Sequence, residues 1–158
     1  MARLLDSFPP ERIKREVFVS GGAFRKKHEF KSEGEKKRFF FILNRFPKED
    51  DRLIIVTATT QIEKRKQHRP LKVLVEITPR EYSPLERNSV IDCESAFVRP
   101  RQLLEKEIHD HQIEPLVPLR VSILKRLCEA ISHSRTLAPI DKQLVLGEEN
   151  QVSPADPR

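Results

Sequence analysis

The sequence predicts a mainly β protein, a closed or half-closed barrel of five or six short strands covered by a helix towards the C-terminus. Two apolar runs at 38–43 and 53–60, rich in aromatic or β-branched residues, stand on either side of a short polar turn. Further short apolar runs, bounded by turn-forming residues, follow as far as Val98. Apolar residues then recur at helical spacing over 119–133.

The part before the first long run predicts short elements. Residues 11–16 follow two prolines and can form a helical turn, and 17–19 can form a short strand before the turn at Gly21 and Gly22. Residues 23–30 alternate weakly and predict another strand, and the polar segment 31–37 predicts a loop.

The runs 38–43 and 53–60 predict an antiparallel hairpin of two strands, the first buried on both sides of the sheet. In such a hairpin the start of the first strand lies beside the end of the second. Arg38 begins the first run, and Thr59 stands near the end of the second. We therefore expect Arg38 and Thr59 to meet at one edge of the sheet.

The remainder of the chain predicts short strands, one helix and a tail. The basic segment 61–70 shows no periodicity and predicts an exposed loop, while 99–111 fits either a helix or a long twisted strand. One domain is expected over 1–146, with an N-terminal extension and a disordered tail at 147–158. The remaining expected elements are strands at 73–77, 89–93 and 96–98, the helix at 119–133 and a packed segment at 144–146.

The net charge favours some classes of function, and the absence of known motifs leaves others without support. The chain of 158 residues has a formal net charge of +6 and a pI near 9.5, which favours a polyanionic partner such as nucleic acid, or an acidic protein. Phosphate-binding glycine loops, dinucleotide fingerprints and zinc-protease motifs are absent from the sequence, and His109-Asp110-His111 lacks a third ligand, so no metal or cofactor is predicted. Two cysteines without metal-site spacing, no signal peptide and no apolar run of about 20 residues predict a cytoplasmic protein rather than a membrane protein.

Arg38 and Thr59 suggest chemistry at the expected edge of the sheet. A planar guanidinium and a hydroxyl can together bind one phosphate. The plainer interpretation is that Arg38 merely begins a strand and that Thr59 satisfies β-propensity. Both interpretations fit these two residues considered alone.

The order of segments resembles the MazF/PemK family of ribonuclease toxins over roughly residues 20–135. The resemblance is carried by RFFFILN, LIIVTATTQ, VLVEI, SVIDCESAFVRPRQL and LRVSILKRLCEAI, in this order. In that family a strand opening with arginine precedes a strand ending in a threonine-glutamine motif, and an amphipathic helix closes the domain. The match lies in the order and character of the segments.

The resemblance implies an SH3-like barrel of five to seven strands with a C-terminal helix, in a homodimer. It also implies metal-independent cleavage of single-stranded RNA by 2′-OH attack, and neutralisation by an acidic antitoxin protein. Arg38 matches the catalytic arginine, which acts in proton transfer and stabilises the transition state, and Thr59 matches the catalytic threonine. The residues expected to bind substrate are Lys37, Thr60, Gln61, Lys64 and Arg65.

Two departures from the family pattern keep other functions open. Phe39 stands where the family usually has a proline after the arginine, and the first loop, KSEGEKK, is short and charged. One alternative is a catalytically silent barrel that binds RNA or protein. Another is a gyrase inhibitor of the CcdB kind, although such proteins end in a helix with tryptophan and this chain has none.

Overall fold

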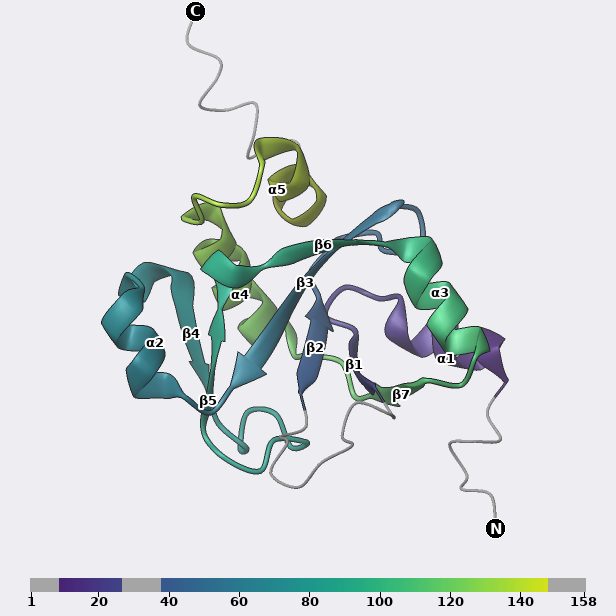
Figure 1. Cartoon of the computed structure of the whole chain (residues 1–158), viewed down its shortest axis with the longest axis horizontal. Helices are drawn as coiled ribbons and strands as arrows, with labels where there is room; N and C mark the ends of the chain where they lie inside the picture. The colour runs from purple at the N-terminus through teal and green to yellow at the C-terminus, as the bar shows by residue number, and fades with distance from the viewer. Residues whose placement is uncertain (1–8, 27–37, 148–158) are drawn as a thin grey trace, which may run out of the picture.

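The computed structural model describes residues 9–26 and 38–147, which form one antiparallel sheet with helices on both sides (Figure 1). The sheet runs in the order β4-β5-β3-β2-β1-β7, and β6 pairs with β3. The strands are β1 (Ala23–Lys26), β2 (Phe39–Ile42), β3 (Arg52–Thr59), β4 (Leu74–Ile77), β5 (Ser89–Asp92), β6 (Phe97–Pro100) and β7 (Ile113–Leu116). The α-helices are α1 (Pro10–Val17), α2 (Ile62–His68), α3 (Arg101–His109), α4 (Val121–Ser132) and α5 (Pro139–Leu146).

The long strand β3 organises the sheet because it pairs with three other strands. Its first half lies against β6, its last two residues lie against β5, and β2 lines its other side. The short 3-10 helix at Cys93–Ser95 links β5 to β6 and lets both follow β3. The predicted hairpin of β2 and β3 is confirmed, with Phe39 opposite Ala58 and Ile42 opposite Ile55.

Two separate hydrophobic cores lie on the two sides of this hairpin. Phe41 and Ile54 point into the core beneath α4 and α5, whereas Ile42 and Ile55 point into the core beneath α1 and α3. All four side chains have no exposed surface. Because successive strand residues point to opposite sides, a continuous apolar run is what a sheet covered on both sides requires.

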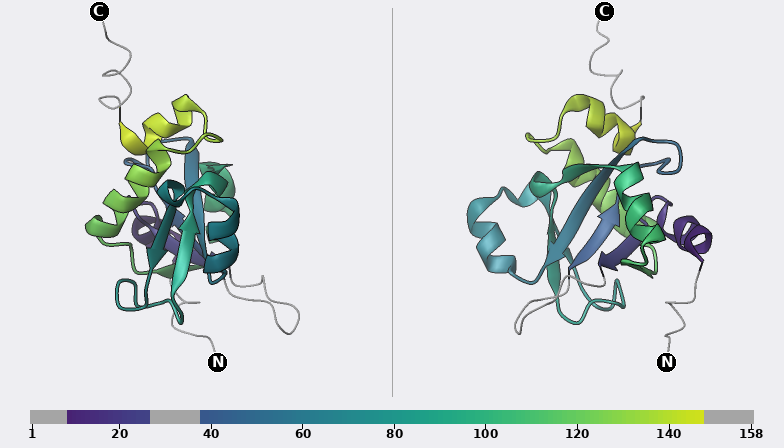
Figure 2. Two further views of the ribbon diagram at one scale, coloured as in Figure 1. Left: turned by 90° about the vertical axis from the view of Figure 1, so that its left-hand side faces the viewer. Right: turned by 45° about the vertical axis from the view of Figure 1, so that its right-hand side comes forward.

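Of the two expected forms of the barrel, closed and half-closed, the sheet topology excludes the closed one. Strands β4 and β7 are the two ends of the path of paired strands, so the sheet is open over the described residues. Helices replace closure: α1 and α3 bury one side of the central strands, and α4 and α5 bury the other. Figure 2 shows α4 and α2 on opposite sides of the sheet.

Other predictions were partly wrong. The strand expected at 17–19 is absent because Val17 ends α1, and the loop expected at 61–70 contains α2. The ambiguous segment 99–111 divides into the end of β6 and all of α3, and β7 was not expected at all. The helices at 11–16 and 119–133 are confirmed as α1 and α4, and 144–146 belongs to α5.

Two further expectations, the loop at 31–37 and nearly all of the tail at 147–158, fall outside the described residues. Within the described part, each helix is too short or too polar to span a lipid bilayer.

Candidate functional site

The hairpin register places the two predicted catalytic residues at the same end of the sheet. The last pair of the β2–β3 register is Phe39 with Ala58. Arg38 precedes Phe39 and Thr59 follows Ala58, so continuing the antiparallel register by one position would bring these two residues opposite each other. Arg38 is exposed immediately before β2, and Thr59 is the partly exposed last residue of β3. The prediction that both lie at one edge therefore agrees with the register, and no hydrogen bond between them is found in the described residues.

Arg38 and Thr59 lie on the side of the sheet that α1 and α3 cover only in part. Along β3, Leu53 and Ile55 on this side are fully buried, whereas Thr57 and Thr59 are partly exposed. Lys26 belongs to the same side, two residues after the buried Phe24. Phe97 belongs to it as well, opposite Ile55. We call Lys26, Arg38, Thr57, Thr59 and Phe97 the open face.

The hydroxyl of Thr59 ends β3 and starts the turn into α2. Its Oγ1 accepts a hydrogen bond from the backbone N–H of Gln61 at 3.2 Å. An accepting hydroxyl retains its own proton, which it can donate to an anion. Gln61 is exposed as the residue before α2, and the backbone oxygen of Thr60 accepts from Ile62. Thr60 and Gln61 therefore directly follow an open-face residue, Thr59, in the sequence.

Helix α2 carries two of the other predicted substrate-binding residues, and salt bridges connect it to the sheet. None of its residues is buried. Lys64 is exposed, while Arg65 is joined to Asp92 of β5 and Lys66 is joined to Glu76 of β4 at 2.9 Å. A helix without a buried apolar side chain depends on such contacts for its position. Lys37, the last predicted substrate-binding residue, is outside the described residues.

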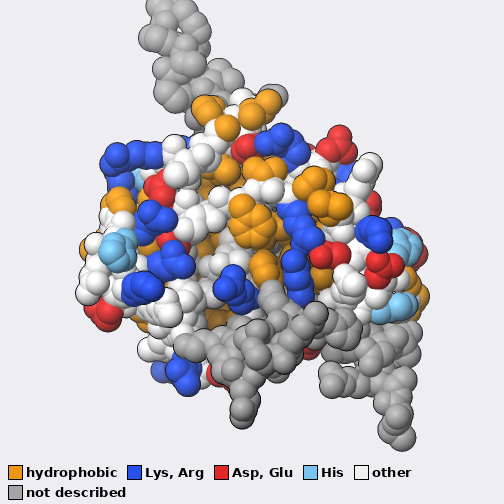
Figure 3. Space-filling view, in the orientation of Figure 1, with side chains coloured by type: hydrophobic (Ala, Val, Ile, Leu, Met, Phe, Trp, Pro, Cys, Tyr) orange, Lys and Arg blue, Asp and Glu red, His pale blue; other side chains and the backbone are white. Residues whose placement is uncertain are grey.

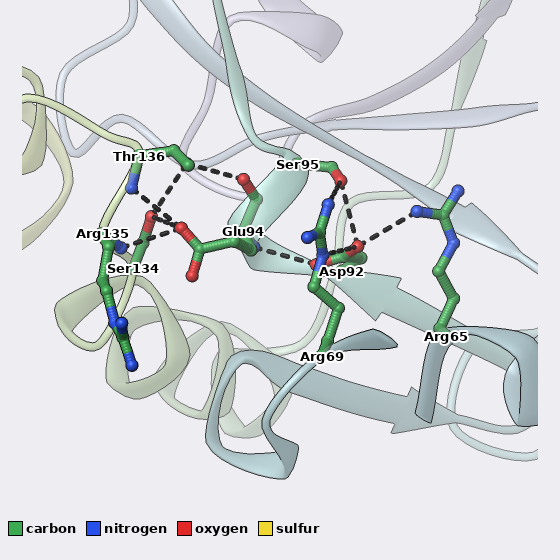
Figure 4. Close-up of polar contacts among 8 residues, drawn as sticks. All are labelled: Arg65, Arg69, Asp92, Glu94, Ser95, Ser134, Arg135 and Thr136. Atoms are coloured by element: carbon green, nitrogen blue, oxygen red, sulfur yellow. Dashed lines mark hydrogen bonds and ion pairs between the residues drawn. The ribbon is translucent and has the colours of Figure 1, made fainter. Parts of the chain in front are cut away.

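Asp92 is the centre of these contacts, as Figure 4 shows. Its carboxylate is 4% exposed and accepts from Arg65 Nη1 at 3.1 Å, Arg69 Nε at 3.0 Å and Ser95 Oγ at 3.0 Å. The backbone N–H of Glu94 donates to its second oxygen at 3.0 Å. One buried carboxylate thus holds the guanidinium groups of two arginines whose side chains are still 37% and 35% exposed. Each retains N–H donors that Asp92 does not use.

Sequence reasoning did not single out Asp92, and it considered Arg69 only as one basic residue of the segment 61–70, which was interpreted either as an RNA-backbone contact or as a solvated charged loop. One signal was present, because residues four apart on a helix share a side, and Arg65 and Arg69 have this spacing. That signal required the segment to be recognised as a helix. The partner carboxylate is 23 residues away from Arg69, so spacing alone could not identify it.

A second carboxylate near this cluster has a structural role. Glu94 Oε2 accepts from the backbone N–H groups of Arg135 and Thr136, both at 2.8 Å, and from Ser134 Oγ at 3.3 Å. Burial alone would raise the pKa of Glu94, but these hydrogen bonds favour the charged form and hold its pKa below the usual value. Glu94 therefore ties the connection between α4 and α5 to the sheet.

Replacing Glu94 with glutamine is expected to destabilise the chain by about 1 kcal/mol at neutral pH, since charge-assisted bonds are lost from a solvent-accessible site. A carboxylate whose pKa is lower in the folded state stabilises the fold fully at pH values above its unfolded pKa of about 4.3. This contribution is lost as the pH falls through the folded-state pKa. Urea unfolding from pH 7 to pH 3 should therefore show the two proteins converging in acid. A constant difference across that range would contradict this role.

Charged side chains also lie on the side of the open face that is next to α3. Glu107 of α3 pairs with Arg99 of β6 at 2.7 Å and with Lys26 of β1 at 3.8 Å. The ammonium of Lys26 also lies 5.5 Å from the centre of the Phe40 ring. Figure 3, in the orientation of Figure 1, shows Lys and Arg side chains around a group of hydrophobic side chains between α2 and α3. The open face thus has cations on both sides.

The described residues contain no group of three or more His, Cys, Asp or Glu side chains able to hold a metal ion. No protein-family model matches the chain, and no characterised protein matches its sequence. The open face carries polar groups of three kinds. Its guanidinium, ammonium and hydroxyl groups are suited to binding the phosphates of a polyanion.

Proposed function

We propose that the chain is a metal-independent endoribonuclease of the MazF/PemK kind, acting on single-stranded RNA. The observation that supports this most directly is the β2–β3 register, whose last pair, Phe39 and Ala58, is flanked by the exposed Arg38 and the partly exposed Thr59. The basic residues on either side of that face support a polyanionic substrate. The exposure of Arg38 and the partial exposure of Thr59 are compatible with contact to a nucleic acid strand.

The proposed reaction is an internal transfer of the phosphodiester. The 2′-oxygen of a ribose attacks the neighbouring phosphorus and loses its proton, while the bond from phosphorus to the 5′-oxygen breaks and that oxygen gains a proton. The products are a 2′,3′-cyclic phosphate and a 5′-hydroxyl. Arg38 would stabilise the negative charge that develops on the phosphoryl oxygens, and Thr59 would donate a hydrogen bond to one of them.

The fold proposal follows the same resemblance. We interpret the chain as an SH3-like sheet that does not close, with α2 inserted between β3 and β4 and α3 between β6 and β7. The homodimer and the acidic antitoxin belong to the same proposal. A basic open face is a suitable surface for an acidic segment that competes with RNA.

The purified chain is expected to cleave single-stranded RNA in the presence of EDTA, because Arg38 and Thr59 supply the charge stabilisation that metals supply elsewhere. Gel analysis should show shortened products, and mass spectrometry should find cyclic phosphate ends. Double-stranded RNA serves as the matched control and should remain intact. A folded chain that leaves varied single-stranded RNAs uncut would refute the nuclease proposal.

RNA binding without cleavage is the second candidate function. It is favoured by Phe39, which takes the position where the family usually has proline and pairs regularly with Ala58 within the sheet. The ring of Phe39 is turned to the opposite side from Arg38 and lies 5.6 Å from the guanidinium carbon of Arg25. RNA affinity that falls steeply with salt, without any products, would select this function over the nuclease.

A further inference from the structure

Phe97 is an exposed aromatic residue in the middle of a charged surface. Its side chain is 39% exposed, although β6 places it opposite the fully buried Ile55. Apart from Phe46 in the turn between β2 and β3, the other phenylalanines of the described residues are buried. The buried phenylalanines are Phe18, Phe24, Phe39, Phe40 and Phe41. An exposed ring on a sheet surface offers a flat apolar area to a ligand.

Cations lie on both sides of Phe97. Towards α2, the hydroxyl of Ser95 accepts from Arg69 Nη2 at 3.3 Å and donates to Asp92, so that the guanidinium is fixed close to β6. Two residues further along β6, Arg99 lies opposite Leu53 on the same side of the sheet and is held by Glu107. Strand residues two apart are separated by about 6.4–6.8 Å. The order along this surface is therefore cation, aromatic ring, cation.

We propose that Phe97 is a stacking platform for one base of a single-stranded RNA, with neighbouring phosphates held by Arg65 and Arg69 on one side and by Arg99 on the other. This inference rests on the proposed RNA substrate and specifies how the strand lies across the open face. Single-stranded nucleic acid is recognised by aromatic stacking combined with a positively charged track. RNA fits this surface better than an acidic peptide does, because an RNA strand carries both flat bases and anionic phosphates, whereas an acidic peptide supplies mainly the anionic groups.

The absence of tryptophan from the sequence allows a direct test. The Phe97→Trp variant has a single tryptophan, whose fluorescence a stacked base should quench. The matched control is Phe46→Trp, at a ring that is 55% exposed and has the guanidinium carbon of Arg45 5.5 Å from its centre. The probe is a 2′-O-methyl RNA oligonucleotide, which cannot be cleaved because its attacking hydroxyl is blocked. Quenching is expected for the variant at 97 and not for the variant at 46.

A second measurement separates stacking from general packing. Phe97→Leu preserves apolar bulk without an aromatic ring and is expected to lower the affinity for the oligonucleotide by about 5- to 100-fold. Phe97→Tyr preserves the ring and should bind as the original chain does. Thermal melting of both variants shows whether the fold is retained, so a loss of affinity in a folded Phe97→Leu protein is attributable to stacking.

The outcomes separate this inference from the proposed function. RNA binding seen by anisotropy without quenching at position 97, and with unchanged affinity in Phe97→Leu, would overturn the platform but leave the RNA function standing. Quenching without cleavage of unmodified RNA would support the platform and remove the nuclease. An absence of RNA binding would overturn both the platform and the RNA function. Quenching by an acidic peptide but not by RNA would overturn both as well and would assign the open face to a protein partner.

Discussion

Replacing Arg38 with alanine is expected to lower the rate of RNA cleavage by about 10³-fold, since removal of one preorganised charge-stabilising donor costs about 10²–10³ and a cation costs at least as much. Arg38 is exposed and lies before β2, so the two cores should be unaffected. Single-turnover cleavage of a short single-stranded RNA measures the rate, and circular dichroism checks the fold.

The matched control is Arg135→Ala, since Arg135 is exposed and its described contact to Glu94 comes from the backbone N–H. That variant loses the same charge but should cleave normally. Arg38→Lys should recover only part of the rate because an ammonium lacks the planar donor fork. Thr59→Val should also be slow, and Thr59→Ser should restore the hydroxyl and most of the activity. Equal activities of Arg38→Ala and Arg135→Ala would exclude Arg38 from catalysis.

Replacing Asp92 with asparagine is expected to destabilise the chain by about 2–3 kcal/mol. Breaking a buried ion pair costs about 3–5 kcal/mol, and partial hydration of the arginines at 37% and 35% exposure reduces this value. The effect should be concentrated in α2, which has no buried residue to hold it. Urea unfolding measures the global loss, and hydrogen exchange of the amides at 62–68 measures the release of the helix.

Asp110→Asn is the matched control for Asp92→Asn. Asp110 makes an exposed pair with Lys106 at 3.2 Å, four residues away on α3. Such pairs contribute about 0.3–0.5 kcal/mol, so this variant should be close to the original chain in stability. If the two variants lose the same stability and α2 retains its amide protection, then Asp92 does not hold the helix.

The hairpin could be predicted because its signals are local. The runs containing Phe41 and Ile54 are apolar at consecutive positions, and the turn between them is short, so antiparallel pairing followed directly. The expectation that Arg38 and Thr59 lie near each other rests on the same pairing. The local pattern could not show whether the sheet closes into a barrel. Closure depends on pairing between edge strands far apart in the sequence and on which helices cover the sheet.

The elements that sequence reasoning missed are those held by distant or polar contacts. Helix α2 lacks an apolar stripe because its partners are Asp92 and Glu76, and hydrophobic periodicity cannot detect a helix of that kind. Strand β7 contains Pro115, a residue that usually argues against a strand and is tolerated at the edge of a sheet. The pairing of Arg65 and Arg69 with Asp92 has no local signal, because Asp92 lies 27 and 23 residues away from them along the chain.

Pro115 also makes the two margins of the sheet unequal. Strand β7 is paired on its inner side with β1, where Pro115 lies opposite Phe24, and proline has no N–H to offer an additional neighbour. Strand β4, at the opposite margin, contains no proline. If two copies of this chain associate by extending their sheets into one, the junction should form through β4, because a proline-containing margin resists growth of the hydrogen-bonded ladder.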